Sequence, residues 1–195
     1  LEDDALAELL CAHEQVLCIV NSRKAAQSIF LKLPEEGSFH LSTLMVPKHR
    51  RSVLEEIRRR LNDGLPCRVV STSLVEAGVD IDFPSVYREL AGLDSILQAA
   101  GRCNREGKRT AEDSIVTIFR RTEKAPPLFG QAIGATNTAL DNNADPASPQ
   151  TMENYFRELR TLNGSAIDKI GVIDAFERGR GGSLYPFRTI AENFH

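Results

Sequence analysis

Long apolar runs are missing from this sequence, and none approaches the length of a membrane-spanning helix. Its first residues, Leu1-Glu2-Asp3-Asp4, are acidic, which excludes a secretory signal peptide at this position. We therefore expect no membrane partner and a cytoplasmic location. The chain also starts abruptly within a helical pattern, so we expect it to be a fragment of a longer protein.

Metal-binding and redox motifs are also absent. The four cysteines, at positions 11, 18, 67 and 103, form no C-x-x-C pair and have no histidine at metal-ligand spacing. The four histidines form no H-E-x-x-H pattern. We expect buried thiols in a reducing compartment, and no metal ion bound by this chain.

Excess positive charge is absent as well, since the net charge of the 195 residues is −3. Basic side chains nevertheless gather in segments 48–60, 102–109 and 120–124. Such segments usually form solvated helix faces, but they also leave local phosphate binding possible.

Short apolar runs alternate with helical patterns up to about residue 120. This alternation predicts an α/β fold with right-handed crossovers and a mostly parallel sheet. Helices are expected after Ser22, from Pro47 and around Gln98. The expected strands are Val16–Val20, Phe39–Val46, Cys67–Thr72, Val86–Leu90 and Ile115–Phe119.

Small polar residues end three of these strands. They are Ser22, Ser42, Thr43, Ser71 and Thr72. Helix capping explains Ser22 well and is plausible for Ser42 and Thr43. Ligands of parallel sheets bind at the carboxyl ends of the strands, and a row of hydroxyls there would also suit a sugar-phosphate backbone.

The composition changes after residue 125. Residues 126–150 are rich in proline, glycine and asparagine, and we expect a linker or mobile loop there. Residues 151–195 are expected to form a helical extension, and Arg178–Gly182 is more typical of a linker than of an RNA-binding segment. The apolar positions of the extension are Met152, Tyr155, Phe156, Leu159, Ile167, Ile170, Ile173 and Phe176.

The segment 93–105 is the most informative for function. If it is helical throughout, Gln98, Arg102 and Arg105 share one face, because they are spaced i, i+4 and i+7. Two guanidiniums on one face suit the charge that builds on a transferring phosphoryl group. A solvated basic face is the simpler interpretation of the segment alone.

Two further features belong to this predicted helix. Asp94 or Ser95 is expected to cap its start. Gly101 removes a side chain beside Arg102, where a ligand or a facing backbone could approach.

A loop between the third and fourth strands carries a second signal. Gly78 permits a tight turn, and the Asp80 carboxylate after it could accept hydrogen bonds from a ribose hydroxyl. This G-V-D-I string is common by itself. It gains value because it lies one strand–helix unit before Gln98.

Together these segments resemble motifs five and six of superfamily-two helicases. Motif six, Q-x-x-G-R-x-x-R, is matched by Gln98, Gly101, Arg102 and Arg105, and motif five by Thr72, Gly78, Asp80 and Ile81. Residues 16–22 are similar to motif four. The strings S-T-L-M-x-x-x-H-R, V-E-A-G-V-D-I-D and A-G-R-C-N-R-E-G resemble, more narrowly, the CRISPR-associated helicase–nuclease of type I interference systems. The ending 185–192 is also similar to that family.

The resemblance implies a RecA-like three-layer sandwich over residues 1–125, the second lobe of the motor. No P-loop, D-E-x-D/H box or nuclease His-Asp cluster is present in the sequence. ATP and magnesium would thus be held mainly by a first lobe outside this chain, and the chain alone would be an inactive part of an ATP hydrolase.

The resemblance also implies residue roles. Arg102 and Arg105 would act as arginine fingers, Gln98 would position them or the attacking water, and Asp80, with Gly78 and Gly101 nearby, would contact the nucleotide. Single-stranded DNA would be held by Thr72, Ser71, Ser42, Thr43, Ser22 and Arg50. Glu76 and Asp82 are alternatively structural caps, and Arg50 could simply face solvent.

The implied partners are single-stranded DNA, the first lobe and nuclease domain of the same protein, and the CRISPR surveillance complex used in antiviral defence. Two alternatives remain. One is a lobe of another superfamily-two RNA or DNA helicase, and the other is a non-catalytic α/β module that binds nucleic acid.

Overall fold

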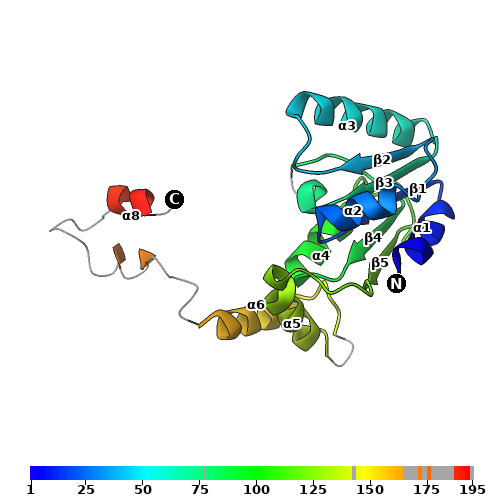
Figure 1. The fold of residues 1–195 in the computed structure, drawn as a ribbon. Helices are drawn as coiled ribbons and strands as arrows, with labels where there is room; N and C mark the ends of the chain where they lie inside the picture. The colour runs from blue at the N-terminus through cyan, green and yellow to red at the C-terminus, as the bar shows by residue number, and fades with distance from the viewer. Residues whose placement is uncertain (77, 142–143, 165–170, 173–174, 177–186, 194–195) are drawn as a thin grey trace.

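The computed structural model describes residues 1–76, 78–141, 144–164, 171–172, 175–176 and 187–193. Five parallel strands form one sheet in the order β2-β3-β1-β4-β5, which confirms the expected α/β class (Figure 1). The strands are β1 (Gln15–Ile19), β2 (Ser38–Leu41), β3 (Cys67–Ser71), β4 (Ser85–Glu89) and β5 (Ile115–Phe119). Four of these five agree with the predicted strands within two residues.

Helices cover both faces of the sheet and continue beyond it. The helices are α1 (Asp3–Cys11), α2 (Arg23–Phe30), α3 (Pro47–Asn62), α4 (Leu93–Ala100), α5 (Gly130–Ala139), α6 (Pro149–Asn163) and α8 (Phe187–Asn193), with short 3₁₀ turns η1 (Ser73–Val75) and η2 (Pro127–Phe129). None of the helices within the described ranges is both long and apolar enough to cross a bilayer.

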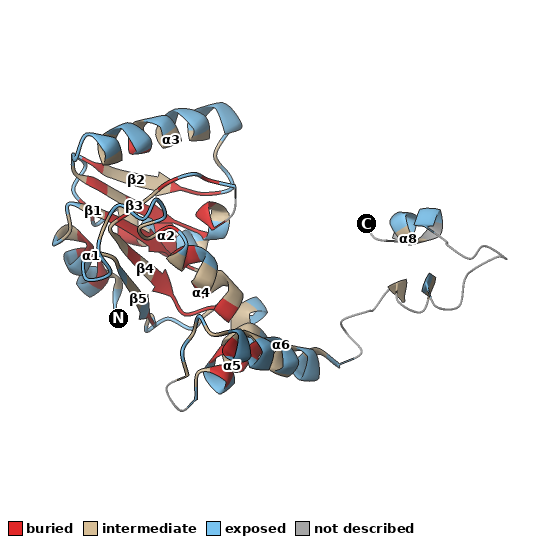
Figure 2. Cartoon of the chain, turned by 180° about the vertical axis from the view of Figure 1, so that it is seen from behind, coloured by how far each residue is buried: buried red, intermediate tan, exposed pale blue. Residues whose placement is uncertain are grey.

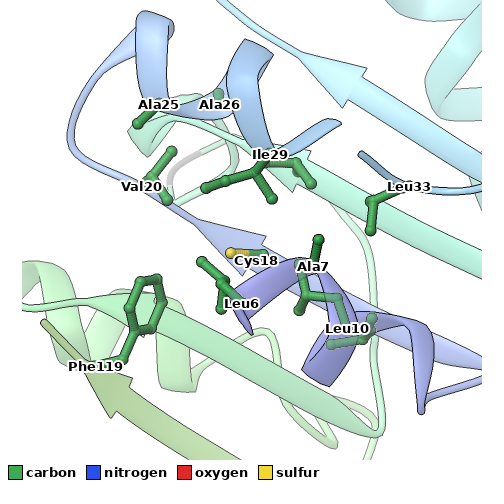
Figure 3. Close-up of a cluster of buried hydrophobic side chains, with 12 residues drawn as sticks. Leu6, Ala7, Leu10, Cys18, Val20, Ala25, Ala26, Ile29, Leu33 and Phe119 are labelled. Carbon is green, nitrogen blue, oxygen red and sulfur yellow. The ribbon is translucent and has the colours of Figure 1, made fainter. Parts of the chain in front are cut away.

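Alternation along β1 divides the core into two layers. Cys18 and its even-numbered neighbours face α1 and α2, where Leu6 and Ile29 are fully buried (Figure 3). Leu17 and Ile19 face the opposite layer, which contains Ile57 of α3 and Ala99 of α4. A strand buried on both faces is apolar at every position, so its apolar run was readily identified.

Helix α3 lies along the outer edge of β2 (Figure 1). Ile57 is its one fully buried residue, while Val53, Leu54 and Leu61 are partly buried against the same core layer. Most of its surface is exposed (Figure 2). Pro47 occupies the first turn, where the missing N–H costs nothing, as the sequence predicted.

Strand β2 ends five residues earlier than predicted. The backbone N–H of Met45 donates to the carbonyl of Ser42 at 3.2 Å, so residues 42–45 form a turn. This turn lets the chain leave the sheet edge before Pro47 starts α3. Ser42 and Thr43 therefore lie beyond the carboxyl end of β2 rather than within it.

Helix α4 does not extend to Arg105, and that prediction was wrong. The helix ends at Ala100 because the next stretch pairs with Phe83: the Phe83 N–H donates to the Arg102 carbonyl at 2.9 Å, and the Phe83 carbonyl accepts from Asn104 at 3.0 Å. Asn104 takes a left-handed conformation, with φ of 50°, which ends the helical path. Gln98, Arg102 and Arg105 consequently share no helical face.

The start of α4 also differs from the prediction. Its N-cap is Gly92, and no side chain caps it. Asp94 instead accepts a hydrogen bond from the Tyr155 hydroxyl at 2.7 Å. A Cβ on Gly92 would lie 2.5 Å from both of those oxygens, so any larger residue would force this hydrogen-bonded pair to move.

The linker expected over residues 126–150 contains α5. This helix packs against α6 and α4 through Leu93, Ala135, Ala139 and Tyr155, which form a third buried cluster. Its buried residues are small, so they carry little apolar periodicity, and two glycines obscure the pattern further.

Helix α6 begins as predicted, since Ser148 accepts a hydrogen bond from the Thr151 N–H at 3.1 Å. Its apolar face is only partly as predicted: Tyr155 is buried, whereas Phe156 is 44% exposed. Several positions of the sequence analysis lie outside the described residues: Ile167, Ile170, Ile173, segment 178–182 and residues 185–186.

Candidate nucleotide and nucleic-acid site

The predicted hydroxyl residues lie at the carboxyl ends of three adjacent strands. The order β2-β3-β1 places Ser42, Thr72 and Ser22 along one edge of the sheet. Ser42 and Thr72 are buried, whereas Thr43 is exposed. The structure therefore brings these positions together, with unequal access to a ligand.

Two of the hydroxyls already have partners within the protein. Ser22 caps α2 by accepting a hydrogen bond from the Ala25 N–H at 3.1 Å. Ser71 is fully buried and donates to the carbonyls of Leu41 (3.3 Å) or Thr72 (2.9 Å). The capping interpretation of Ser22 is confirmed, and Ser71 has a structural bond between adjacent strands.

A buried charge cluster at the same edge was missed by sequence reasoning. Arg88 of β4 is fully buried, and its Nε lies 2.9 Å from Oε1 of Glu76. Its Nη1 donates to Asn21 Oδ1 (2.7 Å), and the Asn21 N–H donates to Glu89 Oε2 (2.7 Å). The signal was present: Arg88 and Glu89 interrupt an otherwise apolar strand run, and charged residues are rarely buried without partners.

Burial changes the pKa values of all three ionisable groups in this cluster. Loss of hydration raises the pKa of Glu76 and of Glu89, and lowers the pKa of Arg88. Arg88 opposes the shift of both carboxyls by attraction. Glu76 is thus a buried ion-pair partner through its side chain, and its backbone is the C-cap of the η1 turn, as one interpretation of the sequence predicted.

Arg102 is directed into the protein. Its side chain is buried, with Nε donating to the Val75 carbonyl (2.9 Å) and Nη2 to the Glu76 carbonyl (2.7 Å). Loss of hydration lowers its pKa, and the nearby Arg105 lowers it further. Arg102 therefore binds the backbone at the end of the η1 turn, while Arg88 pairs with the Glu76 carboxylate.

Arg105 is directed toward solvent. Its Nε lies 3.3 Å from Oδ1 of Asp80, and the two side chains are 41% and 78% exposed. The backbone N–H of Arg105 donates to Asp82 Oδ1 at 2.7 Å, and Asp82 also pairs with Arg109 at 2.9 Å. Asp82 is therefore a structural anchor of the loop that presents Arg105.

Three predicted residues remain to be placed: Gly78, Gln98 and Gly101. Gly78 has φ of +70°, a conformation that favours glycine in the turn before Asp80. Gln98 is exposed on α4. A Cβ on Gly101 would touch only carbonyls of its own helix, at 3.4 Å or more, so no facing backbone among the described residues explains that glycine.

A hollow of about 510 Å³ lies between α3 and the turn before Asp80. We call it the α3 groove; its polar lining includes Arg50, Arg51, Glu55 and Arg58, with Leu74 and Gly78 opposite. Arg50 is half-buried and lines this groove. Arg58 and Asp80 also line a second hollow of about 280 Å³.

Comparison with known proteins identifies the region that contains this site. Residues 12–108 match the family model described as "CRISPR-associated nuclease/helicase Cas3, C-terminal". The Cas3 nuclease/helicase of Haloferax volcanii is 46% identical over 83 residues, covering 41% of this chain and 9% of that protein. The Cas3 of Methanothermobacter thermautotrophicus is 26% identical over 145 residues, covering 71% and 18%.

The fold is similar to solved Cas3 structures. The crystal structure of T. fusca Cas3-ATP superposes with a TM-score of 0.62 at 18% identity, covering 91% of this chain and 23% of that chain. The chain therefore spans less than a quarter of the length of each of these relatives. Over residues 12–108 the chain matches the Cas3 C-terminal family, and it is similar to the C-terminal helicase lobe of Cas3 proteins.

Proposed function

We propose that this lobe is the second half of an ATP-driven motor that moves along single-stranded DNA during CRISPR type I interference in the cytoplasm. The first lobe and a nuclease domain belong to the same full-length protein, and a surveillance complex recruits it. The family match and the two Cas3 relatives support this assignment.

One observation carries the nucleotide part of the proposal. Arg105 and Asp80 form an exposed ion pair. The loops that carry them are held by Arg102, which binds the backbone of the η1 turn, and by the ion pair of Asp82 with Arg109. A guanidinium fixed in this way and open on one side fits a polyphosphate presented by another domain. ATP, with magnesium on the first lobe, would supply the transferring phosphoryl group.

Each residue of the site then has a separate role. Arg105 exchanges Asp80 for phosphate oxygens and stabilises the charge that develops on them. Asp80, released from Arg105, can accept hydrogen bonds from the ribose. Arg102 fixes η1, and Gln98, exposed on α4, orients the attacking water or the arginines.

Thr43 and Thr72, with Ser42 and Arg50, would contact strand phosphates at the carboxyl edge of the sheet. Thr43 and Arg50 are the more accessible of these residues. Ser22 and Ser71 would act indirectly, by holding the backbone of this edge in place.

The half-site model is tested by separating and recombining the lobes. This chain alone should hydrolyse ATP at the background rate, and addition of a purified first lobe with single-stranded DNA should restore turnover. Robust ATP turnover by the isolated chain would overturn the model. Stimulation by RNA rather than DNA would identify an RNA motor of the same superfamily instead.

A further inference from the structure

We propose that Arg58 of α3 binds a backbone phosphate of the nucleic-acid strand in the α3 groove, and that it thereby positions the Asp80–Arg105 pair. This inference rests on the proposed function, because it assigns a phosphate contact and a coupling residue to the same motor. It extends the predicted nucleic-acid contacts beyond Arg50 to Arg51 and Arg58.

The charge of the groove favours a phosphodiester. Three arginines line it, against the single carboxylate of Glu55. The other carboxylates near this part of α3 are neutralised elsewhere: Arg59 pairs with Glu56 at 2.7 Å and with Asp63 at 3.0 Å. The groove therefore has an uncompensated positive charge, which is the condition for binding a polyanion.

Arg58 connects the groove to the nucleotide loop. Its Nε donates to the backbone carbonyl of Asp80 at 2.9 Å, and the Asp80 carboxylate lies 3.3 Å from Arg105. Asp80 is thus held by one arginine at its main chain and by another at its side chain. Within the described parts of the chain, the Asp80 carbonyl is the sole hydrogen-bond acceptor of the Arg58 side chain, so the terminal nitrogens are available for a phosphate.

The exposed position of α3 makes such coupling physically reasonable. The helix lies at the sheet edge with one fully buried residue and three partly buried ones, so a ligand can shift it at lower cost than a helix buried along its length. A phosphate that draws Arg58 into the groove would pull on the Asp80 carbonyl. The carboxylate of the same residue, and Arg105 with it, would then change position relative to the nucleotide.

Three single variants of the complete helicase test the binding step: Arg58→Ala, Arg51→Ala and, as a matched control outside the groove, Arg59→Ala. Affinity for fluorescein-labelled oligothymidylate is measured by anisotropy over a range of salt concentrations. Arg58→Ala and Arg51→Ala should each weaken binding roughly fivefold and reduce the salt slope by about 1. Arg59→Ala should do neither. Equal behaviour of all three variants would overturn the phosphate site.

The coupling step is tested by ATP turnover at saturating oligothymidylate. Arg58→Ala should lower kcat roughly fivefold more than Arg51→Ala does, because only Arg58 also holds Asp80. If the strand stimulates the wild-type enzyme but Arg58→Ala and Arg51→Ala have the same kcat, only the coupling step is overturned. A wild-type enzyme that is not stimulated at all would overturn the proposed function and this inference with it.

Discussion

The guanidinium of Arg102 donates a hydrogen bond to the backbone of Glu76, with 2.7 Å between Nη2 and the carbonyl oxygen. Arg105, three residues later, is instead exposed beside Asp80. The two arginines of one sequence motif therefore have different physical roles, and stability measurements can separate them.

Arg102→Ala should destabilise this chain by about 2–3 kcal/mol, because the buried carbonyls of Val75 and Glu76 lose a charged donor. Arg105→Ala should change the free energy of unfolding by less than about 1 kcal/mol, since its ion pair is exposed. Urea denaturation measures both. Equal losses for the two variants would contradict the assignment.

The buried pair of Arg88 and Glu76 should behave as a coupled unit. Arg88→Met leaves Glu76 buried without its cation and should cost about 3–5 kcal/mol. Adding Glu76→Met to that variant should recover part of the loss. Additive losses in the double-mutant cycle would show that the pair does not interact.

Because of His40, the free energy of unfolding should decrease when the pH is lowered moderately. Burial lowers its pKa, and its Nε2 has no hydrogen-bond partner within the described residues, where the ring stacks on Phe30. The unfolded chain therefore binds the proton more readily than the folded chain does. The contribution of His40 to the free energy of unfolding is fully present above the ordinary histidine pKa, and it is lost as the pH falls through the lowered pKa of the folded chain.

The difference in unfolding free energy between wild type and His40→Gln, followed from pH 7 downward, isolates this effect (about pH 5 is low enough). Glu76 and Glu89 titrate in the opposite sense, because their raised pKa values make acidification favourable, but they are common to both proteins. A difference that does not vary with pH would contradict the role of His40.

Two glycine-to-alanine substitutions should change the stability of the folded chain in opposite directions. Gly92→Ala places a Cβ 2.5 Å from Asp94 Oδ1 and from the Tyr155 hydroxyl, so it should disrupt the contact of α4 with α6 and lower the melting temperature. Gly134→Ala, in α5 with nothing within 4 Å of the new Cβ, should stabilise by about 0.5–1 kcal/mol. Thermal unfolding of both variants is the measurement, and a stabilising Gly92→Ala would contradict the packing described.

Local sequence patterns predicted the sheet better than they predicted the site. The apolar run around Leu17 and the cap at Ser22 are local features, and both formed as expected. The end of α4 depends on pairing of Asn104 with Phe83, which is distant in sequence. No helical periodicity could reveal that contact.

Charged residues that pair across the fold were the hardest to predict. Arg88 lies in β4 and Glu76 follows β3, so their ion pair depends on the sheet order that places these two strands on either side of β1. The Asp80–Arg105 neighbourhood was predicted from motif order, yet the opposite orientations of Arg102 and Arg105 depend on the loop path. The helix α5 was missed because its core contacts are alanines.

The most direct test of the account is ATP turnover by the complete helicase carrying Arg105→Ala, with Arg157→Ala on the exposed face of α6 as the control. Affinity for a non-hydrolysable ATP analogue should be largely retained, while strand-stimulated kcat should fall roughly a thousandfold. The control should keep wild-type kcat. Wild-type turnover by Arg105→Ala would contradict the claim that this lobe supplies a catalytic arginine to the motor.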